Sequence, residues 1–242
     1  MIEARGLTKR FGDFEAVKNL TLSVPPGTIY GFLGPNGSGK STTVKMMTGL
    51  LQPSAGDASI NGLSITAQAL EAKRIIGVLP EGNALFHSLS IWEHLMLCGS
   101  IYGIPKAETE ARGQQLLEIL DLWTQRDTYA DQTSFGMAKK CSLAMAVLHN
   151  PKVLFLDEPF EGIDPVSSRN IKDLLLLLVQ RGVTIFLTSH ILEIAEQLIQ
   201  NFAIIVNGEI ACQQSMAETG NLEELYFQYV ERAPLGDLSW IG

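Results

Sequence analysis

Short apolar runs separated by turn residues fill the first third of the chain. Runs of this length that alternate with polar residues, or that are apolar throughout and contain β-branched residues, are typical of strands. They predict strands at Ile2–Leu7, Leu20–Val24, Thr28–Leu33, Ala58–Ile60 and Ile75–Leu79. A helical stretch, Thr42–Leu50, follows the third of these strands. Turn residues in Leu51–Gly56 and Pro80–Asn83 end that helix and the fifth strand.

Between about residues 90 and 150 the apolar positions change to a helical period. The string from Ser90 to Glu93 has the form of a capping box, in which each side chain accepts a hydrogen bond from the other residue's backbone N–H at a helix start. Two more helical faces follow: Leu116, Leu117 and Leu120 on one, and Met137, Cys141, Ala144, Met145 and Leu148 on another. We therefore expect an all-helical segment inside an α/β chain.

Strand patterns return in the last third of the chain. Three more strands are predicted at Val153–Leu156, Thr184–Leu187 and Ala203–Val206. Between the first two we expect a helix with Asp164 as its N-cap and Pro165 in its first turn. The stretch Leu222–Val230 has the spacing of an amphipathic helix. Short apolar strands that alternate with helices predict a mainly parallel sheet covered on both faces.

The overall composition narrows the classes of protein and partner. With 242 residues, of which 46% are hydrophobic, the chain can bury a core without disulfides or metals, as one large domain. Its net charge of −8 argues against nucleic acid as a partner. The cysteines Cys98, Cys141 and Cys212 are widely spaced and form no CxxC pair. They predict free thiols in a reducing cytosol rather than a disulfide framework or a zinc site.

The sequence has no obvious means of entering a membrane by itself. Its most apolar helical stretch, Leu174–Val179, is bounded by Asp173 and Gln180 and is far too short to span a bilayer. The first residues carry charges where a secretion signal needs an apolar run. If the protein works at a membrane, we expect another chain to supply the membrane-spanning part.

A phosphate-binding pattern, GxxxxGK[ST], stands between a predicted strand and a predicted helix, which is the context that this motif requires. The candidate binding residues are Gly34, Pro35, Asn36, Gly37, Ser38, Gly39, Lys40, Ser41 and Thr42. The glycines let successive N–H groups point at phosphate oxygens, and the following helix adds its positive end. Lys40 supplies a charge for the β- and γ-phosphates, Ser41 a hydroxyl for Mg²⁺, and Thr42 a donor near the α-phosphate.

Two further groups follow apolar strands and should reach the same edge of a parallel sheet. Asp157 and Glu158 come directly after Val153–Leu156. Asp157 is placed to hold the Mg²⁺ shell, and Glu158 to polarise a water for attack on the γ-phosphate. His190 follows the strand Thr184–Leu187 and becomes a candidate γ-phosphate sensor in the company of Lys40 and Glu158.

The order of these motifs resembles the ATP-binding subunit of ABC (ATP-binding cassette) transporters over about residues 1 to 230. Phe11 matches the aromatic A-loop that stacks on adenine, and His190 matches the switch histidine. Glu81 stands at the Q-loop glutamine, and Asp164 lies in the segment that matches the D-loop. Ser134, Phe135, Gly136 and Met137, after Thr133, stand where the family has its signature LSGGQ.

The resemblance implies one ABC ATPase domain over residues 1–242, with a P-loop NTPase fold of the ABC type. Its mainly parallel sheet should carry an antiparallel N-terminal β part and an inserted helical subdomain. The expected division is an α/β core in 1–84 and 151–215, helices in 85–150, and a C-terminal tail in 216–242.

Two motifs, the Q-loop and the signature, depart from the family pattern. Glu81 replaces a glutamine, which adds a carboxylate beside Mg²⁺ and phosphate; it can still ligate the metal, as can Ser41 and Asp157. In the signature, Phe135 and Met137 replace a glycine and the glutamine, while Ser134 and Gly136 keep a hydroxyl and a free N–H for the γ-phosphate. These features together resemble the branch of drug, antibiotic and polysaccharide exporters.

The expected function is therefore ATP hydrolysis with Mg²⁺, by a cassette that pairs with a second copy or a related cassette. The resemblance places it on the inner face of the cell membrane, held by a transmembrane permease subunit. The groove between the Glu81 loop and the helical insert is expected to receive that partner. Three alternatives remain: a soluble ABC ATPase acting on ribosomes or DNA, a P-loop small-molecule kinase, and a cassette that binds ATP without hydrolysing it. The sequence leaves the transported substrate and the direction of transport open.

Overall fold

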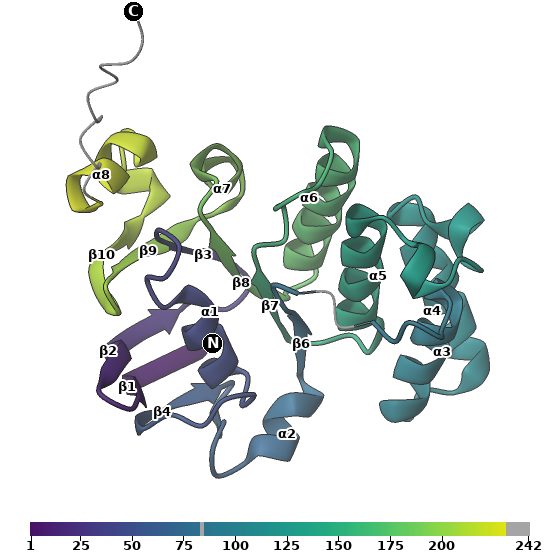
Figure 1. Cartoon of the computed structure of the whole chain (residues 1–242), viewed down its shortest axis with the longest axis horizontal. Helices are drawn as coiled ribbons and strands as arrows, with labels where there is room; N and C mark the ends of the chain where they lie inside the picture. Colours follow the sequence, from purple (N-terminus) through teal and green to yellow (C-terminus); the bar gives the residue numbers. More distant parts are fainter. Residues whose placement is uncertain (83–84, 231–242) are drawn as a thin grey trace, which may run out of the picture.

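A computed structural model describes residues 1–82 and 85–230. Two β-sheets form its frame, and helices pack around the larger one (Figure 1). The strands are β1 (Ile2–Phe11), β2 (Phe14–Val24), β3 (Ile29–Leu33), β4 (Ala55–Ile60), β5 (Leu63–Ser64), β6 (Ile76–Leu79), β7 (Val153–Asp157), β8 (Thr184–Ser189), β9 (Asn201–Val206) and β10 (Glu209–Ser215). The α-helices are α1 (Lys40–Met47), α2 (Ala69–Arg74), α3 (Ile91–Ile101), α4 (Lys106–Ile119), α5 (Phe135–Leu148), α6 (Pro165–Gln180), α7 (Leu192–Leu198) and α8 (Leu222–Tyr229).

The larger sheet has the strand order β10-β9-β3-β8-β7-β6, and all neighbours except β10 and β9 run parallel. In its register Leu33 lies opposite Ser189, and Asp157 lies opposite Thr188. The carboxyl ends of β3, β7 and β8 therefore meet at one edge. The smaller sheet, β2-β1-β4-β5, is antiparallel throughout. These two sheets confirm the mainly parallel sheet and the antiparallel N-terminal part that the sequence predicts.

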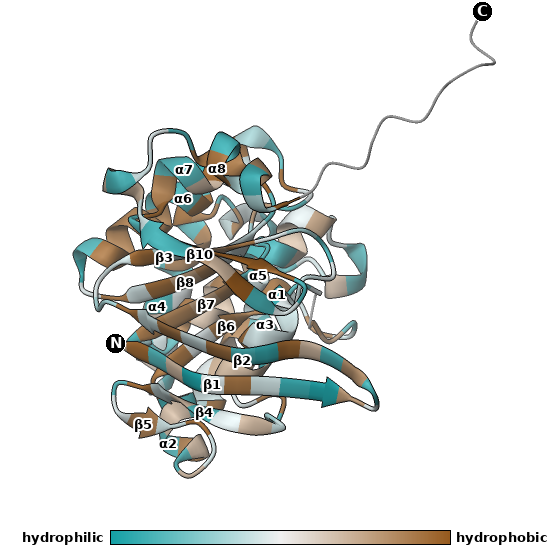
Figure 2. Cartoon of the chain, turned by 90° about the vertical axis from the view of Figure 1, so that its left-hand side faces the viewer, coloured by the Kyte–Doolittle hydropathy of each residue, from teal (hydrophilic) through white to brown (hydrophobic). Residues whose placement is uncertain are grey.

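The central strands divide their side chains between two hydrophobic cores. Phe32, Phe155 and Phe186 face the smaller sheet and α1, and the ring of Phe186 lies 5.3 Å from that of Phe32 and 5.6 Å from that of Phe155. Their neighbours, such as Leu156 and Leu187, face the core formed with the other helices. Successive residues of a strand point to opposite faces, so one apolar run supplies both cores. Figure 2 shows the apolar larger sheet beside the smaller one.

Helices α3, α4 and α5 lie together at the β6 end of the larger sheet (Figure 1). In sequence they follow β6 and precede β7. The predicted capping box is confirmed: Ser90 accepts from the Glu93 N–H, and the Glu93 side chain accepts from the Ser90 N–H. Helix α5 packs on β6 so closely that a Cβ on Gly77 would lie 2.0 Å from the carbonyl oxygen of Ala146. Glycine at this position therefore lets the helical segment contact the sheet backbone directly.

Several elements differ from the sequence-based expectation. Strand β2 begins at Phe14 rather than Leu20, and β10, α2 and α7 were not predicted. The β10 residues alternate between exposed and half-buried, so pairing with β9, rather than a hydrophobic run, makes them a strand. The helix after β3 begins at Lys40, two residues before the predicted start. Asn83 of the predicted turn and residues 231–242 of the predicted tail lie outside the described residues.

Two further expectations concern thiols and caps. All three cysteines are free, and Cys98 and Cys141 are buried. Asp164 caps α6 as predicted, because its side chain accepts from the N–H groups of Val166 and Ser167, both at 3.0 Å.

In the described part of the chain, no helix combines the length and the apolar character needed to cross a bilayer.

Candidate active site

The carboxyl edge of the larger sheet brings most of the predicted site residues together. Strand β3 leads into the glycine-rich loop, β7 ends at Asp157 and Glu158, and β8 leads to His190. A cavity of about 330 Å³ opens beside this loop. Its lining residues are Phe11, Phe14, Ala16, Asn36, Gly37, Gly39, Lys40, Ser41, Thr42, Glu81 and Glu158.

The backbone of the loop depends on its glycines. Gly37 and Gly39 have φ values of 78° and 109°, which L-residues with side chains rarely adopt. A Cβ on Gly39 would also lie 2.7 Å from the carbonyl oxygen of Ala16 in β2. The loop leads into the first turn of α1, whose N–H groups have no partners within the helix. This combination of a curled backbone and a helix N-terminus is suited to phosphate.

Lys40 is almost fully buried at the start of α1. Its Nζ donates to the carbonyl oxygens of Gly34, at 2.8 Å, and Pro35, at 3.2 Å. It also lies 3.4 Å from Oε1 of Glu158. An ammonium group has three protons, so the two carbonyls fix its direction and leave one proton for the cavity side.

Glu158 is buried and held in an unusual backbone conformation, with a φ of 49°. Its N–H donates to Oγ1 of Thr188 at 2.9 Å, and its Oε2 accepts from the His190 N–H at 3.3 Å. Nδ1 of His190 lies 3.0 Å from the same Oε2. Among the described residues, Oε1 has no hydrogen-bond partner, although it contacts Lys40. One carboxylate oxygen is therefore fixed, and the other can accept a proton.

Asp157 differs from its neighbour. Its Oδ1 accepts from Oγ1 of Thr188 at 2.6 Å, and the side chain lies below the surface. Burial raises the pKa of this carboxyl, hydrogen bonds from Thr188 and Ser41 oppose that shift, and the nearby charges of Glu81 and Glu158 add to it. The three neighbouring carboxylates of Asp157, Glu81 and Glu158 therefore favour the binding of a cation between them.

Oxygen ligands suitable for Mg²⁺ gather where α1 begins. Oγ of Ser41 donates to Oε2 of Glu81 at 3.1 Å, and Asp157 lies beside the same hydroxyl. Within residues 1–82 and 85–230, no group of three acidic, histidine or cysteine side chains is arranged to hold a metal by itself. Mg²⁺ is commonly held by one or two carboxylates together with phosphate oxygens and water, so this hydroxyl–carboxylate set fits the ion as part of a nucleotide complex.

Two exposed aromatic side chains form the outer wall of the cavity. Phe11 and Phe14 are a cross-strand pair at the tip of the β1–β2 hairpin, with exposed fractions of 51% and 65%. The sequence analysis chose Phe11 and missed Phe14. A short turn separates the two phenylalanines, and this hairpin spacing was the signal that could have identified Phe14.

The predicted signature residues do not line this cavity. Ser134 caps α5, and its Oγ accepts from the N–H of Met137 at 3.2 Å. Phe135 is about half exposed and packs against the loop after β7, where a Cβ on Gly162 would lie 2.8 Å from Cε1 of its ring. Asp164 is exposed at the start of α6, and hydrogen bonds from Ser167 and Val166 lower its pKa. Within one chain these residues therefore form a surface separate from the cavity.

The sequence analysis passed over Lys139 of α5, which is in direct contact with the segment that follows β7. Its Nζ donates to the carbonyl oxygen of Glu158 and, at 3.4 Å, to that of Glu161. It is only 1% exposed. A lysine in an amphipathic helix normally reaches solvent, so the sequence alone gives no sign of this position.

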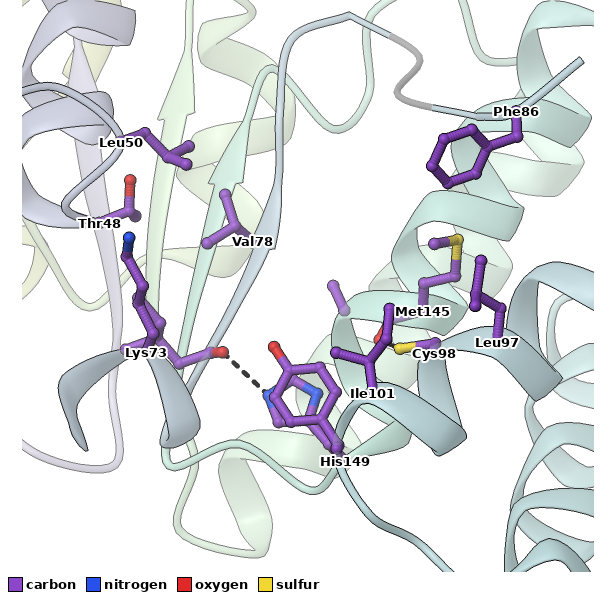
Figure 3. A pocket seen from close by; sticks show the side chains of 13 residues that line it. Thr48, Leu50, Lys73, Val78, Phe86, Leu97, Cys98, Ile101, Met145 and His149 are labelled. Atoms are coloured by element: carbon purple, nitrogen blue, oxygen red, sulfur yellow. Dashed lines mark hydrogen bonds between the residues drawn. The ribbon is translucent and has the colours of Figure 1, made fainter. Parts of the chain in front are cut away.

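A second cavity, of about 370 Å³, lies between strand β6 and helices α3 and α5. Figure 3 shows Thr48, Leu50 and Val78 on one side of it and Phe86, Leu97 and Met145 on the other. Ile101, on α3, is 72% exposed at this cavity. The lining is mostly apolar, in contrast to the polar site beside the glycine-rich loop.

Comparisons with known proteins identify a family and several similar proteins. The profile of the family described as "ABC transporter" matches residues 17–161. The daunorubicin/doxorubicin resistance ATP-binding protein DrrA of Streptomyces peucetius is 35% identical over 98% of this chain and 71% of its own length. The linearmycin resistance ATP-binding protein LnrL of Bacillus subtilis is 35% identical over 87% of this chain and 68% of its own length.

Relatives also occur in larger proteins and among solved structures. The ABC transporter A family member 1 of Dictyostelium discoideum is 39% identical over 89% of this chain, which spans only 24% of that protein. A solved structure described as the ATP-binding subunit of an ABC transporter is 30% identical, with a TM-score of 0.88 over 94% of this chain and 98% of that one. A dimeric cassette bound to ADP and phosphate, 23% identical, has the same fold, with a TM-score of 0.82 over 91% of this chain and 100% of that one.

Proposed function

Because this chain belongs to the ABC transporter family, as an ATP-binding cassette, we propose that the cavity beside its glycine-rich loop binds and hydrolyses ATP to power export through a membrane permease. The observation that carries this proposal is the carboxylate of Glu158. It is buried between Lys40 and His190, with one oxygen held and the other without a hydrogen bond among the described residues.

The nucleotide is proposed to lie along the cavity from the hairpin to the sheet edge. The Phe11 ring offers an apolar face for adenine. The phosphates would lie in the glycine-rich loop, where the N–H groups and Lys40 neutralise their charge. Thr42, in the first turn of α1, adds a donor on the α-phosphate side.

Mg²⁺ is proposed to bind next to the phosphates, held by Ser41, Asp157 and Glu81. When bound, the ion neutralises charge on the phosphate oxygens. The contact between Ser41 and Glu81 supports this assignment, because it brings a carboxylate to the hydroxyl that the motif reserves for the metal.

In hydrolysis, Glu158 is proposed to be the general base. Its Oε1 accepts a proton from the attacking water, while the water oxygen forms a bond to the γ-phosphorus and the bond to the leaving ADP oxygen breaks. His190 holds the other carboxylate oxygen and so fixes the direction of the base. The His190 ring is partly exposed and is proposed to sense the γ-phosphate from this position.

The separate signature surface is proposed to complete a second cassette's site. ABC ATP-binding subunits dimerise, and here Ser134 and Gly136 would cap the ATP held by Lys40 and Ser41 of a second copy or a related cassette. The helix N-terminus of α5 supplies free N–H groups to this surface. Phe135, Met137 and Asp164 would lie at the same dimer contact.

The apolar cavity between sheet and helices is proposed as the docking site of the permease. Cassettes of this family work with such membrane components, and this mostly apolar groove suits an amphipathic segment of a partner (Figure 3). The chain would then lie on the cytoplasmic face of the cell membrane, attached through the partner alone. Two relatives are named for resistance to drugs or antibiotics, which supports export rather than import as the direction.

The test is ATP turnover and dimerisation of two variants. Glu158→Gln should still bind Mg-ATP and form a dimer by light scattering, while its phosphate release falls by about 100-fold or more because the base is lost. Lys40→Ala should instead lose affinity for ATP. Unchanged turnover in Glu158→Gln would remove Glu158 from the role of base.

The same measurements separate the remaining alternatives. Phosphate release by the unmodified chain without an acceptor excludes a small-molecule kinase, and its complete absence with intact ATP binding would indicate a binding-only cassette. An ATPase stimulated by RNA or DNA would indicate the soluble class. The net charge of −8 argues against that class.

A further inference from the structure

Lys139 is a buried cation in the second turn of α5, the helix that begins at the signature residues. Among the described residues it forms no ion pair with a carboxylate, which is unusual for a buried lysine. Its ammonium group must therefore be compensated in another way. The compensating groups lie in the segment that follows β7.

Two backbone carbonyls take the place of a carboxylate. The Nζ of Lys139 donates to the oxygen of Glu158 and to that of Glu161, the latter at 3.4 Å. The Glu161 N–H also donates to the Glu158 oxygen, at 3.3 Å, so the segment turns back on itself at this point. This is where Glu158 has its φ of 49°. A charged donor on the carbonyl of a left-handed residue favours that backbone conformation and the side-chain direction that follows from it.

A third group covers the ammonium. The Phe135 ring lies 5.2 Å from Nζ of Lys139, within the range of a cation–π contact. The same ring touches Gly162, whose φ is 67° and which could carry no Cβ without a contact of 2.8 Å. The signature residue Phe135, the loop after Glu158 and Lys139 therefore form one packed unit.

The charges of the site act on the same lysine. Burial lowers the pKa of Lys139, and the carboxylates of Glu161, Glu158, Asp157 and Glu81 oppose that shift. The ammonium is thus linked to the acidic groups of the cavity by its field as well as by its hydrogen bonds.

We propose that Lys139 is a positioning residue for hydrolysis, which fixes the backbone of Glu158, and so the direction of its carboxylate, relative to the signature end of α5. This inference rests on the proposed function, in which Glu158 is the base and Ser134 and Gly136 cap a second cassette's ATP. One lysine then joins the base of a chain's own site to the surface that completes the other site.

The test compares two variants. Lys139→Met keeps an unbranched side chain of similar length but has no hydrogen-bond donor, whereas Lys139→Arg keeps a charged donor for the two carbonyls. In steady-state ATPase measurements, kcat of Lys139→Met should fall by about tenfold or more with KM for ATP within about twofold, because the base is misplaced while the nucleotide still binds. Lys139→Arg should recover much of that loss. Lys140→Met removes another buried lysine of α5, and its kcat should stay within about threefold of the unmodified chain.

An unchanged kcat in Lys139→Met would overturn the inference. So would a loss that Lys140→Met shares, or one that Lys139→Arg does not relieve, since either would indicate damage to the helix rather than a lost donor. If Lys139→Met is not recovered as folded protein, the comparison of Lys139→Arg with Lys139→Gln takes its place, with the slower turnover expected in Lys139→Gln. The Glu158→Gln variant separates the proposed function from the role of Lys139. Rapid hydrolysis by Glu158→Gln would overturn the role of Glu158 as the base. Stalled hydrolysis by Glu158→Gln together with normal turnover by Lys139→Met would overturn only the positioning role of Lys139.

Discussion

Two neighbouring carboxylates end strand β7 in different environments. Asp157 is within the sheet register, and a threonine hydroxyl donates to it, whereas Glu158 turns into a left-handed conformation. This difference supports the proposed division of roles, in which Asp157 holds the cation and Glu158 takes the proton. The sequence predicts the pair from its place after an apolar strand, but the conformation of Glu158 depends on Thr188 and Lys139, which are distant in the chain.

Glu81 provides a residue-scale test of the metal site. In Glu81→Gln, the Ser41 hydroxyl keeps an acceptor, but one negative charge leaves the group that surrounds the proposed ion. We expect the Mg²⁺ concentration for half-maximal ATPase to rise by about threefold to tenfold, because a charged oxygen ligand is exchanged for a neutral one. The measurement is a Mg²⁺ titration of phosphate release at fixed ATP.

An exposed carboxylate far from the cavity supplies the control for this titration. Glu118 lies on the surface of α4 and accepts a hydrogen bond from Gln114 at 2.8 Å. Glu118→Gln changes the net charge by the same amount without touching the proposed metal site. If both variants shift the titration equally, Glu81 has no special part in holding the ion.

At the scale of elements, two helix starts were predicted to the residue, although the start of α1 was placed two residues late and α2 and α7 were missed. The capping box at Ser90 and the Asp164–Pro165 start of α6 were both predicted, because each depends on residues adjacent in sequence. The strands β3, β7 and β8 were predictable as well, since they are apolar on both faces. Strand β10 and the first half of β2 were missed because their strand character comes from pairing with a partner, which a single segment does not reveal.

The capping box makes a quantitative prediction about stability. Ser90→Ala removes the acceptor for the Glu93 N–H and should lower the free energy of unfolding by about 1 kcal/mol. Denaturant unfolding followed by circular dichroism measures this change. Ser100→Ala, on the exposed side of the same helix, should leave the free energy of unfolding within about 0.5 kcal/mol. Equal effects of the two variants would show that the box adds nothing beyond a serine in a helix.

At the scale of the whole molecule, two cavities of different character are lined by separate sets of residues. The polar one is the proposed nucleotide site, and the apolar one lies between β6 and helices α3 and α5. The sequence analysis anticipated the polar cavity from its motifs. It expected the partner in a groove beside the Glu81 loop, but Glu81 lines the polar cavity and not the apolar one. Residues from the segment after α1 and from α2, β6, α3 and α5 line the apolar cavity, and they share no local pattern.

The groove predicts how the chain is held at a membrane. Ile101→Glu places a charge in its exposed apolar wall and should reduce, by about tenfold, the share of tagged protein that sediments with membranes of the source cells, while ATPase activity in solution stays within about twofold. Leu176→Glu makes the same change at an exposed leucine of α6 outside the groove. Equal membrane association of all three proteins would reject the groove as the docking site.

Gly39 shows how tightly the two sheets and the glycine-rich loop depend on one another. Its missing side chain serves the loop, whose backbone curls at a φ of 109°, and it also gives β2 room to lie with the Ala16 carbonyl 2.7 Å from where a Cβ would be. Glycine is therefore required at this position for two reasons: the backbone conformation of the phosphate-binding loop and the packing of β2 against that loop. A substitution of Gly39 would disturb both the loop conformation and the packing of β2. Loss of nucleotide binding in such a variant would therefore not report on phosphate recognition alone. Lys40, which is not part of that crowded contact, is the cleaner probe.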